Sequence, residues 1–300
     1  MMPLRLPVSP QSRVVRGFAV ASLVSEILIV VTGGAVRVTG SGLGCPEWPL
    51  CTSDSLVTTP EMGLHGIIEF VNRTLTGPLL LIALAMVVVV WGFRSTRRDI
   101  FGMSLSLVAG IVLQAVIGGV SVWVDLGPYV VGLHFAVSAV LVALATLLVL
   151  RVWGNTLPSL RDVTATQWLF ASVTISVIIA GILTTGAGPH SGDDMASRNG
   201  FFFNDVLTAH RAAAIVALVL ISLFLLRART AQIRSAWGGV AAAYVGQIAV
   251  GVLQVQLGLP AEMVIIHLLL SMVIVSVTVR AIYASTTSGS SATARNNAVK

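Results

Sequence analysis

The 300 residues are 56% hydrophobic and only 10% charged, with a mean hydropathy of +0.93. A water-soluble domain is excluded because too little polar surface is available to face water. The net charge of +6 could suit a nucleic-acid-binding protein, but the basic residues lie in short segments between apolar stretches, as in membrane proteins. We therefore expect a lipid bilayer as the surroundings and no nucleic-acid partner.

Eight apolar stretches are long enough to cross about 30 Å of hydrocarbon as helices. In chain order they cover residues 17–38, 67–93, 101–124, 130–153, 166–187, 205–226, 237–258 and 262–283. Their apolar residues are continuous rather than alternating, which favours helices over the strands of a β-barrel. The sequence predicts an all-α integral membrane protein with eight transmembrane helices, arranged as two parallel four-helix-bundle repeats.

The segments around these stretches set the expected organisation. It comprises an N-terminus (1–16), an N-terminal four-helix half (17–153), a linker (154–165), a C-terminal half (166–283) and a disordered tail (284–300). Most of the 18 Lys and Arg residues fall in the two termini, the linker and the loops after the second and sixth stretches. The positive-inside rule then places both termini in the cytoplasm.

The two halves repeat each other. Four residues of the first half recur 133 positions later, pairing Gln114 with Gln247, Gly118 with Gly251, Leu126 with Leu259 and His134 with His267. Residues 39–42 resemble residues 185–188, and Asn72-Arg73 corresponds to His210-Arg211. Each half has four helices and starts on the same side, so the repeats are parallel. Gln114 and Gln247 are expected to form hydrogen bonds between helices.

His134, His210 and His267 lie near the outer starts of their helices. An imidazole at membrane depth is costly and therefore indicates function. His210 and His267 come from different helices at similar depth, as two axial ligands of a haem iron would; polar contact between helices is the alternative. Arg211 is expected to pair with haem propionates, or else to orient the loop.

The first half departs from this symmetry because Asn72 stands where the second half has His210. Glu69 lies one turn before Asn72, and His65 one turn before Glu69. A carboxylate beside an open iron position could deliver protons for oxygen chemistry; an ion pair with Arg73 is the alternative. His65 is either another ligand or a residue at the end of a loop.

Three other groups draw interest. Cys45 and Cys51 share the first external loop, which favours a disulfide that either staples the loop or exchanges electrons. Glu26 lies in the middle of the first helix and is expected to be protonated or paired inside the bundle, with a proton path as its other role. His190, in the loop before the sixth helix, is expected to be solvated.

Residues 17–283 resemble the haem A synthases, membrane oxygenases of cytochrome oxidase assembly. The resemblance rests on Gly33–Cys51, Glu69-x-x-Asn72-Arg73, Leu133-His134, His210-Arg211 and His267. It implies a permanent haem b held by His210 and His267, with Arg211 beside it. It also implies haem O as the substrate, oxidised at a methyl group to a formyl group with oxygen and reducing equivalents. Asn72 departs from the family pattern, which has a histidine there.

The resemblance further assigns Glu69 to catalysis, and His134, Asn72, Arg73, His65 and Arg37 to the substrate site. Cys45 and Cys51 match a disulfide found in many members. Expected partners are haem O synthase, oxidase assembly factors, an electron donor of unknown identity and a second copy of the chain. The expected location is a bacterial-type plasma membrane, with both pockets near the external face. A membrane b-type cytochrome that only carries electrons is the alternative function.

Overall fold

The computed structural model describes residues 9–155 and 160–298. Within these ranges it contains no strand and eight long helices: α1 (Arg13–Val38), α2 (Gly63–Val90), α3 (Arg98–Trp123), α4 (Pro128–Val152), α5 (Ala165–Ala187), α6 (Phe203–Arg227), α7 (Ala231–Gln256) and α8 (Ala261–Ala298). Short 3-10 turns are η1 (Pro60–Met62), η2 (Trp91–Phe93) and η3 (Leu160–Asp162). All eight helices are long and apolar enough to span a membrane. The predicted eight-helix fold class is confirmed.

Polar caps explain why several helices begin before their apolar runs. Ser12 accepts a hydrogen bond from the Val15 amide at the start of α1, and Thr230 does the same for Ile233 in α7. Thr164 and Gln167 form a reciprocal capping box on α5. Each cap satisfies an amide that the helix itself leaves unpaired.

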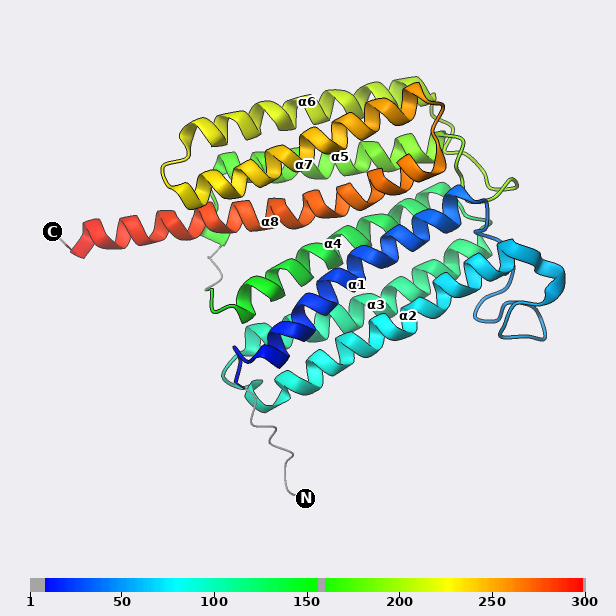
Figure 1. The fold of residues 1–300 in the computed structure, drawn as a ribbon, viewed down its shortest axis with the longest axis horizontal. Coiled ribbons are helices and arrows are strands. Elements are labelled where there is room, and N and C mark those ends of the chain that lie inside the picture. The colour runs from blue at the N-terminus through cyan, green and yellow to red at the C-terminus, as the bar shows by residue number, and fades with distance from the viewer. Residues whose placement is uncertain (1–8, 156–159, 299–300) are drawn as a thin grey trace, which may run out of the picture.

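The helices form two groups that lie side by side (Figure 1). α1 to α4 pack on one another, and α5 to α8 form the second group. α8 contacts both α1 and α4, and α5 contacts α4, so these four helices join the groups. The joint is mainly apolar and contains Val30, Ala139, Val142, Met272 and Val275. The start of α1 and the end of α8 lie at the same end of the bundle (Figure 1).

The turns before α4 and α8 confirm the repeat in three dimensions. Leu126 and Leu259, which are 133 residues apart, both adopt a left-handed backbone, with φ of 56° and 63°. Each donates its amide hydrogen to an earlier carbonyl, that of Ser121 and Gln254 respectively. Non-glycine residues rarely adopt this conformation, so its recurrence identifies the two turns as the same structure.

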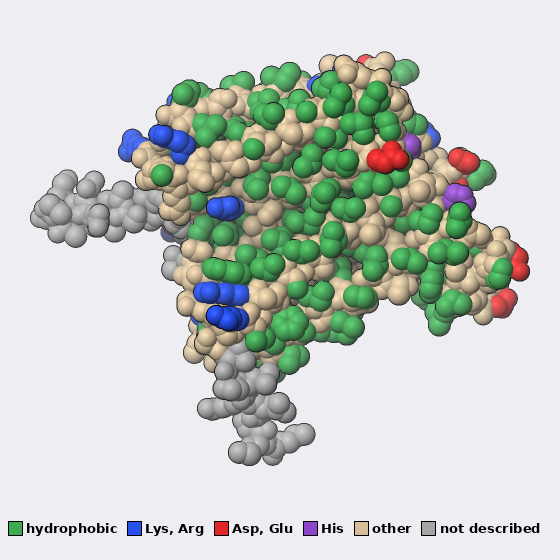
Figure 2. Space-filling model, in the orientation of Figure 1, with side chains coloured by type: hydrophobic (Ala, Val, Ile, Leu, Met, Phe, Trp, Pro, Cys, Tyr) green, Lys and Arg blue, Asp and Glu red, His purple; other side chains and the backbone are tan. Residues whose placement is uncertain are grey.

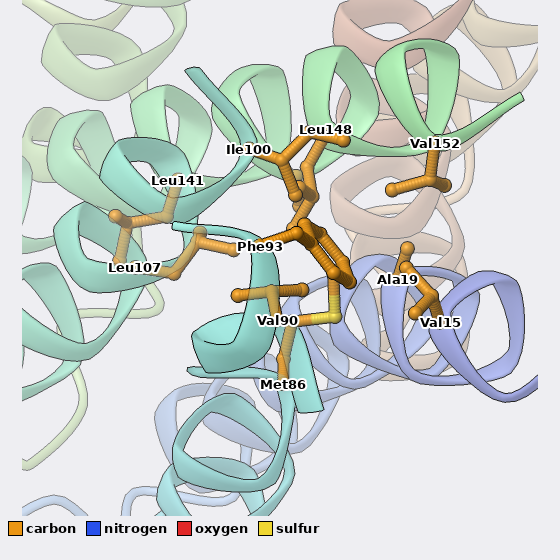
Figure 3. Packing of buried hydrophobic residues seen from close by; sticks show 11 residues of the cluster. Val15, Ala19, Met86, Val90, Phe93, Ile100, Leu107, Leu141, Leu148 and Val152 are labelled. Atoms are coloured by element: carbon orange, nitrogen blue, oxygen red, sulfur yellow. The ribbon is translucent and has the colours of Figure 1, made fainter. Parts of the chain in front are cut away.

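Apolar clusters hold each group together away from the loops that follow α1 and α5. Figure 3 shows the cluster of the first group, in which Phe93 lies among side chains from α1, α2, α3 and α4. In the second group, Phe224 stacks on Trp237 with ring centroids 3.9 Å apart, and Phe170 packs edge-on against Trp237. These clusters leave the other end of each bundle to the polar residues described below.

Charge separates along the bundle. On the face shown in Figure 2, Lys and Arg side chains gather at the end where α1 starts and α8 ends, whereas Asp, Glu and His side chains gather at the opposite end. We call these the basic end and the acidic end. Large apolar side chains cover the surface between them (Figure 2), as expected for helices that face lipid.

The end of the chain differs from the sequence prediction. A disordered tail was expected from residue 284, but α8 continues as helix to Ala298. Residues 284–298 contain no proline and a single glycine, and extending an existing helix costs much less than nucleating one. The remainder of the expected tail lies outside the described residues, as do residues 1–8 and the linker segment 156–159.

Candidate functional site

His210 of α6 and His267 of α8 face each other near the acidic end. Their ring centroids are 6.2 Å apart, with the ring planes 67° from parallel. Two imidazoles on opposite sides of one metal ion need about 6 Å between their centres, because each metal–nitrogen bond is about 2 Å long. The pair therefore has the spacing of two axial ligands, and both side chains are half-buried.

Neighbouring groups fix the orientation of both rings. His210 Nδ1 donates to the carbonyl oxygen of Val177, 2.9 Å away, which leaves Nε2 available for a metal. The Gln247 side-chain amide donates to the backbone carbonyl of His267 over 3.0 Å. His267 Nδ1 is buried and has no hydrogen-bond partner among the described residues. It lies 3.5 Å from the place that a Cβ on Gly251 would take, so it faces α7 and leaves Nε2 available for a metal.

Two glycines give these rings their room. A Cβ on Gly181 of α5 would lie 3.1 Å from His210 Cε1, and a Cβ on Gly251 of α7 would lie 3.0 Å from His267 Cε1. Both contacts would be tighter than ordinary carbon packing. Glycine at these positions therefore allows each imidazole to lie against the neighbouring helix.

The first half repeats one side of this arrangement. Gln114 donates to the backbone carbonyl of His134 over 3.0 Å, as Gln247 does to His267. Gly118 lies beside His134 Cε1 as Gly251 lies beside His267 Cε1. The predicted interhelical hydrogen bonds of the two glutamines are confirmed. His134 Nδ1 is likewise buried and unpaired among the described residues.

The other side of the first pocket is different. Asn72 of α2 occupies the position equivalent to His210, and its Oδ1 atom is buried with no hydrogen-bond partner in the described structure. Glu69, one turn earlier, is 5% exposed. The equivalent residue in α6 is Leu207, so only the first half has a carboxylate here.

Glu69 forms the ion pair with Arg73 that the sequence offered as an alternative to catalysis. Arg73 Nε donates to Glu69 Oε1 over 2.9 Å, and its Nη2 also contacts that oxygen. The other carboxylate oxygen, Oε2, accepts from the backbone amide of Cys45 at 2.6 Å. Arg73 also donates to the carbonyl oxygens of Cys45, Glu47 and Leu50. The pair therefore anchors the loop between α1 and α2.

This loop carries the Cys45–Cys51 disulfide, as predicted. Trp48, inside the disulfide ring, rests on Gly119 of α3, where an added Cβ would come within 2.3 Å of the indole. Trp48 also packs edge-on against Trp123, with centroids 5.4 Å apart. We call residues 45–51 the disulfide loop. It is fastened to α2 by Arg73 and to α3 by Trp48, on the side of the bundle that holds Asn72 and His134.

His65 and Arg37 do not lie free beside the pocket. His65 Nδ1 forms a 3.0 Å hydrogen bond with Ser41 Oγ in the loop after α1. Arg37 donates to the backbone carbonyls of Thr185 and His190, so it connects α1 to the α5–α6 loop. By contrast, Arg211 is exposed and forms no hydrogen bond or ion pair with any described residue. It is thus available to an external anion.

Sequence reasoning missed the contacts that join the halves at the acidic end. His190 is half-buried rather than solvated, because its Nε2 hydrogen bonds to the carbonyl of Leu259 while its own carbonyl accepts from Arg37. The Gly42 amide also donates to the Gly192 carbonyl over 2.7 Å. Nothing in the sequence signalled these contacts, because they join segments that are about 70 to 150 residues apart.

A cleft lies near these loops. It has a volume of about 510 Å³ and is lined by Thr39, Gly40, Leu43, Gly44, Pro46, Met62, His65, Asp193 and Asp194. A smaller cleft of about 200 Å³ adjoins Arg37 and His190. Both open at the acidic end, between the loop after α1 and the α5–α6 loop.

A model of the cytochrome oxidase assembly protein family matches residues 16–279, which include every site residue described above. The chain belongs to this family. The family predicted from the sequence motifs is therefore confirmed. The site residues can now be compared with what binding of a haem requires.

Relatives of the chain include proteins named heme A synthase. Those of Listeria welshimeri and Bacillus licheniformis are 28% and 27% identical over 137 and 143 residues, and that of Bacillus pumilus is 38% identical over 137 residues. These alignments cover 45%, 47% and 43% of this chain and 45%, 46% and 42% of the relatives. The chain thus matches less than half the length of these curated relatives.

The family's chemistry fits the donor set. Among the side chains that the structure describes, in residues 9–155 and 161–286, no group of three or more His, Cys, Asp or Glu could hold a bare metal ion. The His210–His267 pair suits a metal that already has other ligands, such as the iron of a porphyrin. The spacing of the two rings and the glycines beside them agree with this group.

Proposed function

We propose that this chain is a haem A synthase, which oxidises a methyl group of haem O to a formyl group for terminal oxidase assembly. Haem b is the permanent cofactor of the C-terminal half, and haem O is the substrate of the N-terminal half. The supporting observation is that one scaffold occurs twice with different side chains. One copy presents two imidazoles, and the other presents one imidazole, one amide and a buried carboxylate.

In the C-terminal half, His210 and His267 hold the iron of haem b. Bound there, this haem supplies one-electron transfer between a reductant and the substrate pocket. Gly181, Gly251, Val177 and Gln247 keep both rings in place. Arg211, which is exposed and unpaired among the described residues, binds a propionate through its planar guanidinium.

In the N-terminal half, His134 holds the iron of the substrate and Asn72 lies on the opposite side. Glu69 receives and returns protons at the edge of this pocket, because it is buried one turn from Asn72. Arg73 holds the Glu69 carboxylate and the disulfide loop together. His65 and Arg37 shape the mouth of the pocket through Ser41 and the α5–α6 loop.

The charge distribution supports an orientation. The basic end, with both termini, faces the cytoplasm of a bacterial-type cell, and both haem pockets lie near the external face. Haem O synthase would then deliver the substrate and oxidase assembly factors would receive the product. The electron donor and a second copy of the chain are the other partners.

Haem extraction tests this proposal. The full chain is co-expressed with a source of haem O, purified, and its extracted haems are identified by mass. We expect haem b together with haem A, and a vector-only strain should yield haem O without haem A. Recovery of haem b with unconverted haem O would contradict the proposal and favour a membrane b-type cytochrome that only carries electrons.

A further inference from the structure

We infer that the substrate iron has a single protein ligand, His134, and that its other axial position is open beside Asn72 to a small neutral molecule such as water, dioxygen or carbon monoxide. The inference rests on the proposed function only in requiring that the N-terminal half binds a haem. It assigns to the two pockets different coordination numbers, and hence different affinities for external ligands.

His134 is prepared to act as a ligand in the same way as His267. Both backbone carbonyls accept a 3.0 Å hydrogen bond from a glutamine 20 residues earlier. Both rings present Cε1 to a glycine of the preceding helix, and both Nδ1 atoms are buried without a described partner. The first pocket therefore retains one complete ligand side of the second.

On the side of the pocket opposite His134, α2 has no histidine at the position equivalent to His210. Asn72 has a carboxamide, whose neutral oxygen is a poor ligand for iron compared with imidazole. Its Oδ1 is nevertheless buried and unpaired among the described residues. A buried amide oxygen lacks a hydrogen-bond donor at considerable cost, and a bound water would supply one. An oxygen-sized ligand could instead accept from the Asn72 amide group.

The two pockets also differ at a residue of the helix that precedes α2 or α6. Gly181 leaves room for His210, since an added Cβ would lie 3.1 Å from the ring. By the 146-residue offset that relates α1 to α5, the first-half equivalent of Gly181 is Ala35. Where the second half has a glycine beside its histidine, the first half thus has an alanine and an asparagine, and an imidazole at position 72 would meet the extra methyl group if the two helix pairs pack alike.

Other strong iron ligands in the first half are already engaged. His65 is exposed, two turns before Asn72, and hydrogen bonded to Ser41. Its backbone lies under the loop, where a Cβ on Gly44 would come within 2.3 Å of the His65 carbonyl oxygen. Both oxygens of Glu69 accept hydrogen bonds, from Arg73 and from the Cys45 amide. Cys45 and Cys51 are joined in the disulfide.

Spectroscopy and carbon monoxide binding test the inference on the full chain loaded anaerobically with haem b and haem O. We expect the ferric protein to show one low-spin and one high-spin haem by electron paramagnetic resonance. The ferrous protein should bind about one carbon monoxide for every two haems, since a haem with two histidine ligands has no free position. The His267→Ala variant, which opens the second pocket, is the positive control.

Two variants sharpen the test. Asn72→His alone should keep the high-spin signal, because the Ala35 methyl group would take the space that Gly181 leaves for His210. Asn72→His combined with Ala35→Gly should convert that haem to low spin and abolish most carbon monoxide binding. Two low-spin haems in the unmodified protein, with no carbon monoxide bound, would overturn the inference while leaving the proposed function intact. Failure to bind a second haem at all would instead contradict the proposed function, and this inference with it.

Discussion

The Arg73 guanidinium joins Glu69, one turn earlier on α2, to the disulfide loop. It pairs with the Glu69 carboxylate and donates to three carbonyl oxygens of that loop, while Glu69 accepts from the Cys45 amide. Glu69, whose carboxylate is proposed to transfer protons, therefore also stabilises the position of the disulfide loop. The two contributions can be separated by substitution.

Glu69→Gln should lower haem A formation by about a hundredfold, because an amide cannot exchange protons as a general acid or base does. It can still accept the hydrogen bond from Cys45, so we expect only a small loss of thermal stability. The measurements are the ratio of haem A to haem O in extracts and the melting temperature in detergent.

Arg73→Gln supplies the comparison. It leaves a buried carboxylate without its cation and should cost about 3 kcal/mol of folding stability, with a smaller effect on turnover per folded molecule than Glu69→Gln. Arg98→Gln, at an exposed residue with no hydrogen bond to a described residue, is the matched control and should change neither quantity. Equal turnover losses in the Glu69 and Arg73 variants would reduce Glu69 to a loop anchor.

The disulfide is expected to staple the loop rather than to exchange electrons. Replacing both Cys45 and Cys51 by serine should cost about 2 kcal/mol, the chain-entropy value for so small a ring. Haem A formation should remain within about twofold, because Arg73 and Trp48 still fasten the loop. Melting temperature and haem extraction measure both effects. If the two cysteines exchanged electrons, the folded double-serine variant would instead form no haem A.

Much of the fold could be predicted because the hydrophobic signal is local. Each helix is a continuous apolar run, and the 133-residue repeat of Gln, Gly, Leu and His already paired α3–α4 with α7–α8. That His210 and His267 face each other was predicted from their similar depth in two helices of the same half. The helical end of α8 could not be predicted from its composition, because the long helix before it favours continuation.

Contacts between loops and helices could not be predicted from the sequence. Arg73 could be placed one turn from Glu69, but its bonds to the disulfide loop depend on how that loop folds back over α2. The link from Arg37 to His190 spans 153 residues and joins the two halves. A lone histidine in a polar loop gives no signal of such a contact.

Gly181→Ala tests the fit of the C-terminal pocket. The new methyl group would lie 3.1 Å from His210 Cε1, and the hydrogen bond to Val177 restrains the ring from moving away. Displacing a ligand through its supporting contacts should weaken haem b retention about tenfold. Gly238→Ala in α7, where nothing lies within 4 Å of an added Cβ, is the control. The readout is haem b per protein after purification; equal retention by both variants would show that His210 does not need this space.

Glu26 is 3% exposed in the middle of α1, and no described side chain hydrogen bonds to it. Replacing it with leucine should raise folding stability by about 2 kcal/mol, since a carboxyl group in a membrane interior is costly. We expect haem A formation to stay unchanged. The melting temperature and extracted haems test this; a several-fold fall in haem A with haem b retained would place Glu26 on a proton path.

The division of labour between the pockets is tested most directly by the haem content of single-histidine variants purified from cells that lack haem O. The unmodified chain and His134→Ala should both retain about one haem b per molecule, whereas His210→Ala should lose most of it, because a single remaining imidazole holds the iron weakly. Loss of haem b from His134→Ala with retention in His210→Ala would contradict the account, since it would place the permanent cofactor in the N-terminal half.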